Sequence, residues 1–100
     1  MKKSETESSS WFVYLLGCAD GSLYTGVTTD VTARVERHNL GKGAKYTRGR
    51  LPVELLFSEE VGDHGLALQR EYAIKQLPKK KKIELIAARK QQQRGYKESL

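Results

Sequence analysis

The chain has 100 residues, of which 38% are hydrophobic and 30% are charged. A chain of this length folds around one core, and its composition is typical of a globular rather than a disordered protein. Eighteen Lys and Arg against twelve Asp and Glu give a net charge of +6. This excess favours a polyanionic partner, nucleic acid before an acidic membrane surface. A basic protein that is merely soluble is the alternative on charge alone.

The single cysteine, Cys18, excludes an internal disulfide and a zinc site built from several thiolates. No stretch has the length and apolar character of a membrane span, and residues 1–10 lack the apolar core of a signal peptide. We therefore expect a cytoplasmic protein that makes no contact with membranes.

The first half of the chain predicts two strands and a helix. Residues 1–10 are polar and are predicted to be a disordered tail. The dense apolar run 11–18 predicts a strand mostly buried on both faces, and 22–27 predicts a second strand. Thr28, Thr29 or Asp30 can then cap a helix that runs to about Leu40, where Gly41 ends it.

The second half predicts a loop, a strand and two helices. Residues 41–50 form the loop, and 52–58 form a third strand with an apolar centre. A helix spans roughly 64–77, and Pro78 fits the first turn of another helix, which continues to about residue 89. The polar segment 91–100 is predicted to be a flexible tail.

This order predicts a small α/β sandwich, in which helices flank a three-stranded, largely antiparallel sheet (β-β-α-β-α-α). The domain comprises residues 11–90, between the tails 1–10 and 91–100.

The turn between the first two strands decides whether Tyr14 and Tyr24 share a face of the sheet. A two-residue turn at Asp20-Gly21 would place the two phenols on opposite faces, because side chains alternate along a strand. A three-residue loop that ends at a left-handed Gly21, with a bulge, would instead pair Tyr14 with Gly26 and put both phenols on one face. A joint site of the two tyrosines therefore requires the bulged turn.

Arg34 and His38 are four residues apart on the first predicted helix and are therefore neighbours on one face. They lie beside the apolar positions Val31 and Val35. Two solvated charges on the helix of a basic protein are the simpler interpretation, and a catalytic pair is the alternative.

Glu71 falls about 40° outside the apolar arc of its predicted helix. That arc consists of Leu66, Ala67, Ala73, Ile74 and Leu77. A carboxylate at the rim of a packed face can hold a hard divalent cation. An ion pair with Lys75, one helical turn later, is the simpler alternative.

The predicted loop 41–50 is strongly basic. Its cations surround one aromatic ring: Lys42, Lys45, Arg48 and Arg50 around Tyr46. Cations neutralise phosphates and an exposed ring can stack on a base, so the loop is a candidate nucleic-acid contact. A basic surface loop without such a role is an equal alternative.

Taken in order, these residues resemble the GIY-YIG nuclease domain, which is found in homing, repair and junction endonucleases. Val13-Tyr14-Leu15 occupies the place of the first signature, and Tyr24-Thr25-Gly26 that of the second. Arg34 and His38 follow on the next helix, and Glu71 on the next long helix. The resemblance covers about residues 11–89 and is greatest to the small stand-alone bacterial members. The Asn common near the domain's end has no counterpart, since the only Asn is Asn39.

The resemblance implies a divalent-metal-dependent endonuclease that hydrolyses phosphodiester bonds. Glu71 would be the protein ligand of one Mg²⁺ or Mn²⁺ ion, and Arg34 would bind the scissile phosphate. Tyr14 or Tyr24 would orient or deprotonate the attacking water with help from His38.

The implied substrate is DNA, with RNA as an alternative, and the implied role is DNA repair or processing. Lys45, Tyr46 and Thr47 would contact the nucleic-acid backbone. Cleavage would be structure- or strand-selective with low sequence specificity, unless a partner protein supplies more. A non-catalytic nucleic-acid-binding module is the main alternative, although such a module would not need Glu71. An adaptor that recruits a nuclease is disfavoured by the lack of an apolar surface stripe.

Overall fold

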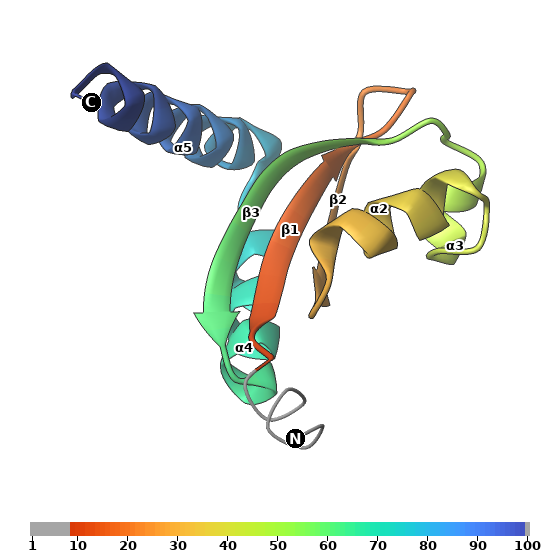
Figure 1. The fold of residues 1–100 in the computed structure, drawn as a ribbon. Helices are drawn as coiled ribbons and strands as arrows, with labels where there is room; N and C mark the ends of the chain where they lie inside the picture. Colours follow the sequence, from red (N-terminus) through yellow and green to blue (C-terminus); the bar gives the residue numbers. More distant parts are fainter. Residues whose placement is uncertain (1–8, 100) are drawn as a thin grey trace.

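Three antiparallel strands form one sheet in the order β2-β1-β3, with helices on both faces (Figure 1). The computed structural model describes residues 9–99, with side chains as far as residue 90. The strands are β1 (Trp11–Gly17), β2 (Leu23–Thr28) and β3 (Glu54–Gly62). The helices are α2 (Val31–Asn39), α3 (Lys45–Arg48), α4 (His64–Lys75) and α5 (Lys79–Ser99). The predicted sandwich and its order are confirmed, with the one-turn helix α3 added inside the predicted loop.

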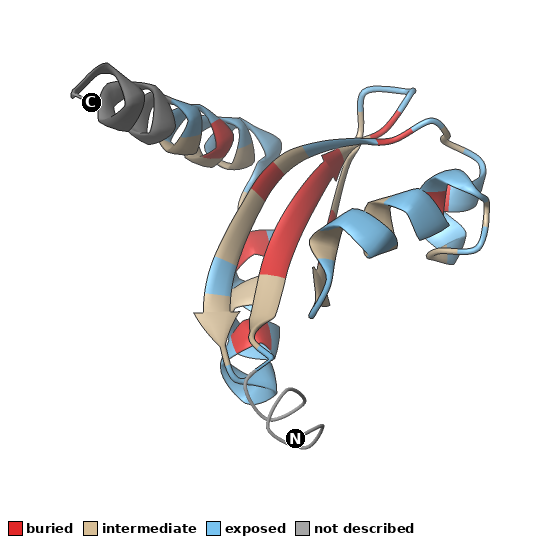
Figure 2. Cartoon of the chain, in the orientation of Figure 1, coloured by how far each residue is buried: buried red, intermediate tan, exposed pale blue. Residues whose placement is uncertain are grey.

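The central strand β1 is buried on both faces, as its apolar run predicts (Figure 2). Val13 and Leu15 face one side, where they pack with side chains of β3, α4 and α5. Tyr14 and Leu16 face the other side, toward α2 and the segment that leads into β3. The tyrosine of the first signature is therefore a core residue on the α2 side of the sheet.

The turn after β1 has the bulged geometry that a joint tyrosine site requires. Gly21 has a φ of +87°, and Tyr14 pairs with Gly26 while Leu16 pairs with Tyr24. The Asp20 carboxylate accepts a hydrogen bond from the backbone N–H of Ser22 at 3.0 Å and stabilises the turn. The rings of Tyr14 and Tyr24 consequently lie on one face, with centroids 6.4 Å apart.

Helix α2 is held at both ends. The Asp30 carboxylate caps its start by accepting from the backbone N–H of Ala33 at 3.1 Å. At its end, Asn39 donates to the carbonyl of Val53 at 3.0 Å and accepts from the backbone N–H of Val53 at 2.7 Å. This pair of bonds ties the end of α2 to the segment before β3, so that His38 is held against the sheet.

Two elements extend well beyond their predicted ends. Strand β3 begins at Glu54 and continues to Gly62 instead of ending at residue 58, because an edge strand with one open side tolerates polar residues. Helix α5 continues to Ser99, beyond its predicted end near residue 89. The apolar periodicity stops near residue 89, but Gln, Arg and Lys are good helix formers without it.

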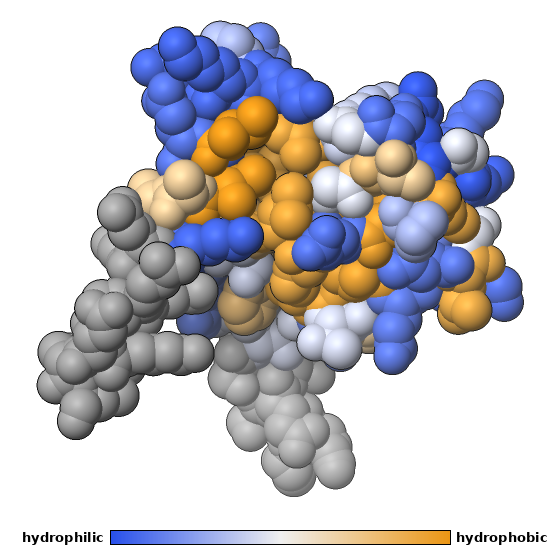
Figure 3. Space-filling view, turned by 90° about the horizontal axis from the view of Figure 1, so that it is seen from above, coloured by the Kyte–Doolittle hydropathy of each residue, from blue (hydrophilic) through white to orange (hydrophobic). Residues whose placement is uncertain are grey.

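The surface is mixed in character. Seen from above, apolar side chains gather in the middle and hydrophilic ones surround them (Figure 3). No helix in the part of the chain that the structure describes is both long and apolar enough to cross a membrane.

Candidate active site

Tyr14, His38 and Thr47 form a buried chain of hydrogen bonds on the α2 side of the sheet. Tyr14 Oη lies 3.0 Å from Nε2 of His38, and Nδ1 of His38 lies 2.8 Å from Oγ1 of Thr47. The exposed fraction of each of the three residues is 1% or less. His38 is therefore not the solvated charge of the simpler interpretation, because its ring is enclosed and both its nitrogens are engaged.

Two glycines that we did not single out in the sequence make room for these rings. A Cβ atom at Gly26 would lie 2.5 Å from Tyr14 Oη, and a Cβ at Gly43 would overlap the His38 imidazole. Gly26 ends the second signature, and its missing side chain lets the Tyr14 phenol pass over β2. The signal was therefore present in the Tyr-x-Gly motif, but its meaning depends on the pairing of Tyr14 with Gly26.

Arg34 on α2 and Glu71 on α4 both act on the Tyr14 phenol. Burial raises the pKa of Tyr14, a hydrogen bond from Arg34 opposes this shift, and the nearby Tyr24 and Glu71 reinforce it. The net effect raises the pKa, so the phenol is protonated at neutral pH. The other four predicted catalytic and metal-binding residues thus lie around Tyr14: Tyr24, Arg34, His38 and Glu71.

The environment of His38 also favours its neutral form. Burial lowers the pKa of the imidazole, and the positive charge of Arg34 lowers it further. A neutral imidazole that faces a protonated phenol is a suitable acceptor for a proton in transit.

An aromatic series leads from this buried centre to the surface. The Tyr24 ring lies edge-on to His38, with centroids 5.3 Å apart, and stacks on Tyr46 at 6.0 Å with an interplanar angle of 24°. The Arg50 guanidinium lies 3.9 Å from the centre of the Tyr46 ring. Tyr46 is 40% exposed and forms the outer end of the series.

A hollow of about 290 Å³ opens beside this series. Its lining comes from β2, α3, α4 and the first turns of α5: Leu23, Tyr24, Thr25, Tyr46, Lys75 and Lys82. The candidate site therefore lies at the β2 edge of the sheet, where side chains from both faces meet. Two lysines make this hollow suitable for an anionic ligand.

Glu71 lies deeper than its helical arc predicts. Leu66 is 50% exposed, so the predicted arc is wrong at that position, and α4 buries Ala67 and Ile74 instead. Glu71 lies one helical turn from Ala67, and its side chain is only 17% exposed. The predicted ion pair is confirmed, since Lys75 Nζ lies 3.1 Å from Glu71 Oε2.

The donor set fits a divalent ion that keeps most of its water ligands. Within the described residues, no group of three or more His, Cys, Asp or Glu side chains is arranged to hold a metal. One largely buried carboxylate beside Tyr14, already paired with a cation, suits Mg²⁺ or Mn²⁺, which keep several waters and share a substrate phosphate. Glu71 is the residue that would hold such an ion.

The residues predicted to contact nucleic acid separate into two groups. The exposed ones are Lys42, Lys45, Tyr46 and Arg48. Arg50 is half-buried and pairs with Asp20, with Nε 2.9 Å from Oδ2. Thr47 is fully buried, and its hydroxyl faces His38 rather than the surface.

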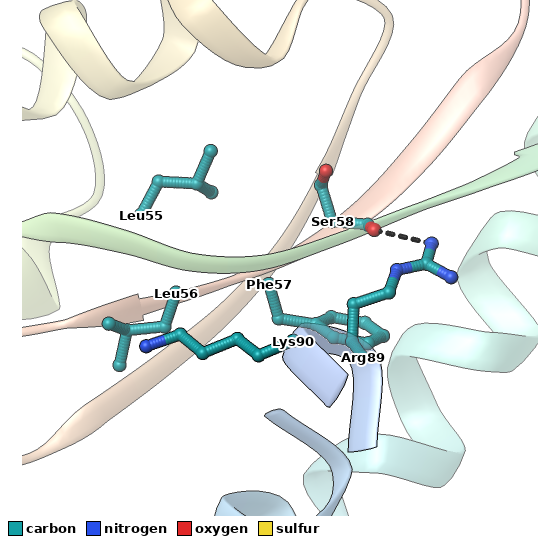
Figure 4. A pocket seen from close by; sticks show the side chains of 6 residues that line it. All are labelled: Leu55, Leu56, Phe57, Ser58, Arg89 and Lys90. Atoms are coloured by element: carbon teal, nitrogen blue, oxygen red, sulfur yellow. Dashed lines mark hydrogen bonds between the residues drawn. The ribbon is translucent and has the colours of Figure 1, made fainter. Parts of the chain in front are cut away.

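A second hollow, of about 230 Å³, lies between β3 and α5 (Figure 4). It is lined by Leu55, Leu56, Phe57, Ser58, Arg89 and Lys90. Arg89 donates to the carbonyl of Ser58 at 2.7 Å, which caps part of the open edge of β3. The lining has no carboxylate or imidazole, and its charged groups are the cations Arg89 and Lys90.

Comparison with known families identifies the domain. A family model described as the GIY-YIG catalytic domain matches residues 10–84. The chain belongs to the GIY-YIG family. The GIY-YIG match includes both tyrosines and Arg34, His38 and Glu71, so the whole cluster lies inside the family's catalytic domain.

Its relatives share most of this domain. A UPF0213 protein of Staphylococcus aureus is 54% identical over 80 residues, which is 80% of this chain and 98% of the relative. A UPF0213 protein of Klebsiella pneumoniae is 54% identical over 77 residues, covering 77% of this chain and 73% of the relative.

Two solved structures agree with the fold. The solution structure of a UPF0213 protein from Bacillus halodurans has 46% identity and a TM-score of 0.52, covering 79% of this chain and 84% of that chain. A second solution structure, from E. faecalis, has 38% identity and a TM-score of 0.55 at the same coverage.

Proposed function

We propose that this GIY-YIG protein is a divalent-metal-dependent endonuclease that hydrolyses phosphodiester bonds in DNA. The observation that carries the proposal is the convergence on one buried phenol. Tyr14 is hydrogen-bonded to His38 and lies within electrostatic reach of Arg34 and Glu71. A carboxylate, a guanidinium and a proton acceptor around one hydroxyl match the needs of phosphodiester hydrolysis.

In this proposal Tyr14 relays a proton. Attack of water on phosphorus releases a proton, which Tyr14 Oη accepts as its own proton passes to Nε2 of His38, 3.0 Å away. A concerted transfer avoids a free phenolate, which the raised pKa of Tyr14 would disfavour. Tyr24, whose ring lies against His38 and the hollow, would border the substrate.

Two residues would stabilise the charge on the scissile phosphate. Arg34 would hold a phosphate oxygen and stabilise the charge that develops on it. Glu71 would hold one Mg²⁺ or Mn²⁺ ion, which when bound polarises a phosphate oxygen as a Lewis acid. Lys75 must then give up its contact with the Glu71 carboxylate, 3.1 Å away.

The exposed cations beside the hollow would bind the DNA backbone. Lys42, Lys45 and Arg48 lie on and before α3, and Tyr46 is 40% exposed among them. Contacts to the DNA backbone depend on its charge and shape and do not distinguish bases, so cleavage would be structure- or strand-selective with low sequence specificity. A cytoplasmic role in DNA repair or processing fits such an activity, and a protein partner could add specificity.

A cleavage assay with a matched carboxylate control tests the proposal. Supercoiled, single-stranded and branched DNA are incubated with Mg²⁺ or Mn²⁺ and either wild type, Glu71→Gln or Glu84→Gln. Glu84 is 54% exposed on α5 and pairs with Lys81, so its loss should leave cleavage unchanged. We expect Glu71→Gln to reduce cleavage at least about 100-fold.

Two results would contradict the proposal. Undiminished cleavage by Glu71→Gln would exclude this metal site as the source of activity. No cleavage by the wild type, together with salt-sensitive DNA binding that Lys45→Gln weakens, would favour the non-catalytic binding module. In that case the salt slope should fall by roughly 0.7 to 0.9 for each phosphate contact removed.

A further inference from the structure

The buried hydrogen bonds around His38 form a series with a defined direction. At one end the guanidinium of Arg34, which can only donate, acts on the Tyr14 phenol, and at the other end lies the carbonyl of Ala44, which can only accept. Between them lie Tyr14, His38 and Thr47, each of which can donate and accept. Because one end can only donate and the other can only accept, the positions of the protons on the three residues between them are determined.

The direction follows first from the Ala44 end. Thr47 Oγ1 donates its single hydrogen to the carbonyl of Ala44 at 2.9 Å. The 2.8 Å contact between Thr47 Oγ1 and Nδ1 of His38 then needs its proton from the imidazole. A neutral imidazole has one N–H, so Nε2 carries the lone pair.

The Arg34 end gives the same answer. The guanidinium of Arg34, which lowers the pKa of Tyr14, has no acceptor atom, so the phenol hydrogen has to point elsewhere, and Nε2 of His38 lies 3.0 Å away. No buried side-chain nitrogen or oxygen among the described residues lacks a partner, which agrees with this pattern. The burial that lowers the pKa of His38 keeps the imidazole in the neutral form that this pattern requires.

We propose that Thr47 is a positioning residue, whose hydroxyl holds the proton on Nδ1 of His38 so that Nε2 is free to take the proton of Tyr14. The inference rests on the proposed function, in which Tyr14 passes its proton to His38. Thr47 acts through His38 and needs no contact with substrate. This role accounts for a fully buried threonine within a basic, surface-lying segment.

The local fold makes the arrangement specific to a hydroxyl. Ala44 is the N-cap residue of α3 and Thr47 lies in that single turn, so the bond from Thr47 to the Ala44 carbonyl is made within the turn itself. Gly43 lies against the imidazole and leaves no room for a side chain there. Without the hydroxyl, Nδ1–H has no partner in this series, and the other tautomer would satisfy the ring by donating from Nε2 to Tyr14 Oη. Tyr14 would then have no acceptor for its proton.

The test compares wild type with Thr47→Val, which keeps the shape, and Thr47→Ser, which keeps the hydroxyl. The tautomer of His38 is read by long-range ¹H–¹⁵N NMR at a pH where the imidazole is neutral. Only His38 and His64 contribute signals, and His64→Gln assigns them. Steady-state cleavage gives kcat and KM for the same proteins.

We expect Nδ1–H on His38 in wild type and Thr47→Ser, and a shift toward Nε2–H in Thr47→Val. Thr47→Val should lower kcat about 100-fold with KM within about twofold, and Thr47→Ser should restore most of the rate. An Nε2–H tautomer in the wild type would overturn the inference without any variant. Equal loss in Thr47→Ser and Thr47→Val would also overturn it, because keeping the hydroxyl would then give no advantage in rate.

The two readouts separate this inference from the proposed function. The NMR measurement needs neither DNA nor metal, so a wild-type protein with Nδ1–H that cuts no DNA would refute the nuclease activity and leave the tautomer assignment intact. Cleavage that survives in Thr47→Val with unchanged kcat would refute the positioning role and leave the nuclease activity intact.

Discussion

Gly26→Ala is expected to damage the site through a single methyl group. A Cβ at this position lies 2.5 Å from Tyr14 Oη, and ordinary contact begins at 3.4 Å, so the phenol must move by about 0.9 Å. Tyr14 is only 1% exposed and has little space in which to move. A shift of this size can stretch its 3.0 Å contact with His38 beyond hydrogen-bonding range.

The expected magnitudes follow from this displacement. Overpacking of a dense core costs about 1–3 kcal/mol, and replacing Gly by Ala returns about 0.4–1 kcal/mol by restricting the unfolded chain. We therefore expect a loss of roughly 1–2 kcal/mol in the free energy of unfolding. A misplacement of about 1 Å at a reacting group can cost about 100-fold in rate, so kcat should fall by that order.

Urea unfolding and steady-state cleavage of labelled DNA measure the two effects. Gly49→Ala is the matched control, because Gly49 has a φ of −93° and a Cβ there meets nothing within 4 Å. In a Tyr14→Phe background, Gly26→Ala should lower kcat no further. A folded Gly26→Ala protein with a wild-type kcat would refute the reasoning, since the phenol position would then be irrelevant to the reaction.

Three further predictions concern His38, Lys75 and Asn39. Burial lowers the pKa of His38, so below about pH 6.5 the unfolded chain binds a proton more readily than the folded chain does. The free energy of unfolding should therefore fall as the pH drops below about 6.5 and through the lower pKa of the folded state. Urea titrations at several pH values should show a smaller dependence in His38→Gln, and equal dependence would contradict the assignment. Lys75→Met should lower the Mn²⁺ concentration for half-saturation about twofold, since an ion pair one helical turn apart is worth about 0.3–0.5 kcal/mol. Water proton relaxation measures this concentration, and an unchanged value in Lys75→Met would contradict the prediction. Asn39→Ala should cost about 2 kcal/mol in urea unfolding, because it leaves the buried N–H of Val53 without its partner, and a loss below about 0.5 kcal/mol would argue against the clamp.

The strands of the sheet were accessible from the sequence, and their register was narrowed to two alternatives. The turn at Asp20-Gly21 allowed two registers, and only the bulged one put Tyr14 and Tyr24 on the same face. Cap residues such as Asp30 likewise marked the start of α2 correctly. Local chemistry and periodicity decide these features, so local reasoning suffices.

The surroundings of His38 were not accessible in this way. Thr47 lies in a basic, glycine-rich segment that predicts an exposed loop, and its burial depends on a contact with His38, nine residues earlier. The roles of Gly26 and Gly43 depend on ring positions that exist only after the sheet and α2 have assembled. Such contacts are tertiary, and no periodicity of the sequence encodes them.

Helix α4 shows a different limit. Hydropathy predicts that Leu66 is buried, but the helix packs through Ala67 and Ile74 with the Glu71 carboxylate close to the same face. A charged side chain in a largely buried place misleads an argument based on apolar arcs. Departures of this kind are expected where a site, rather than stability, determines the residue.

Single-turnover cleavage by Tyr14→Phe tests the central claim most directly. Tyr72→Phe is the matched control, because Tyr72 is 68% exposed on α4. We predict that Tyr14→Phe binds DNA as the wild type does and cleaves it at least about 100-fold more slowly, since the phenol oxygen that relays the proton is gone. Cleavage by Tyr14→Phe at the wild-type rate would contradict the account.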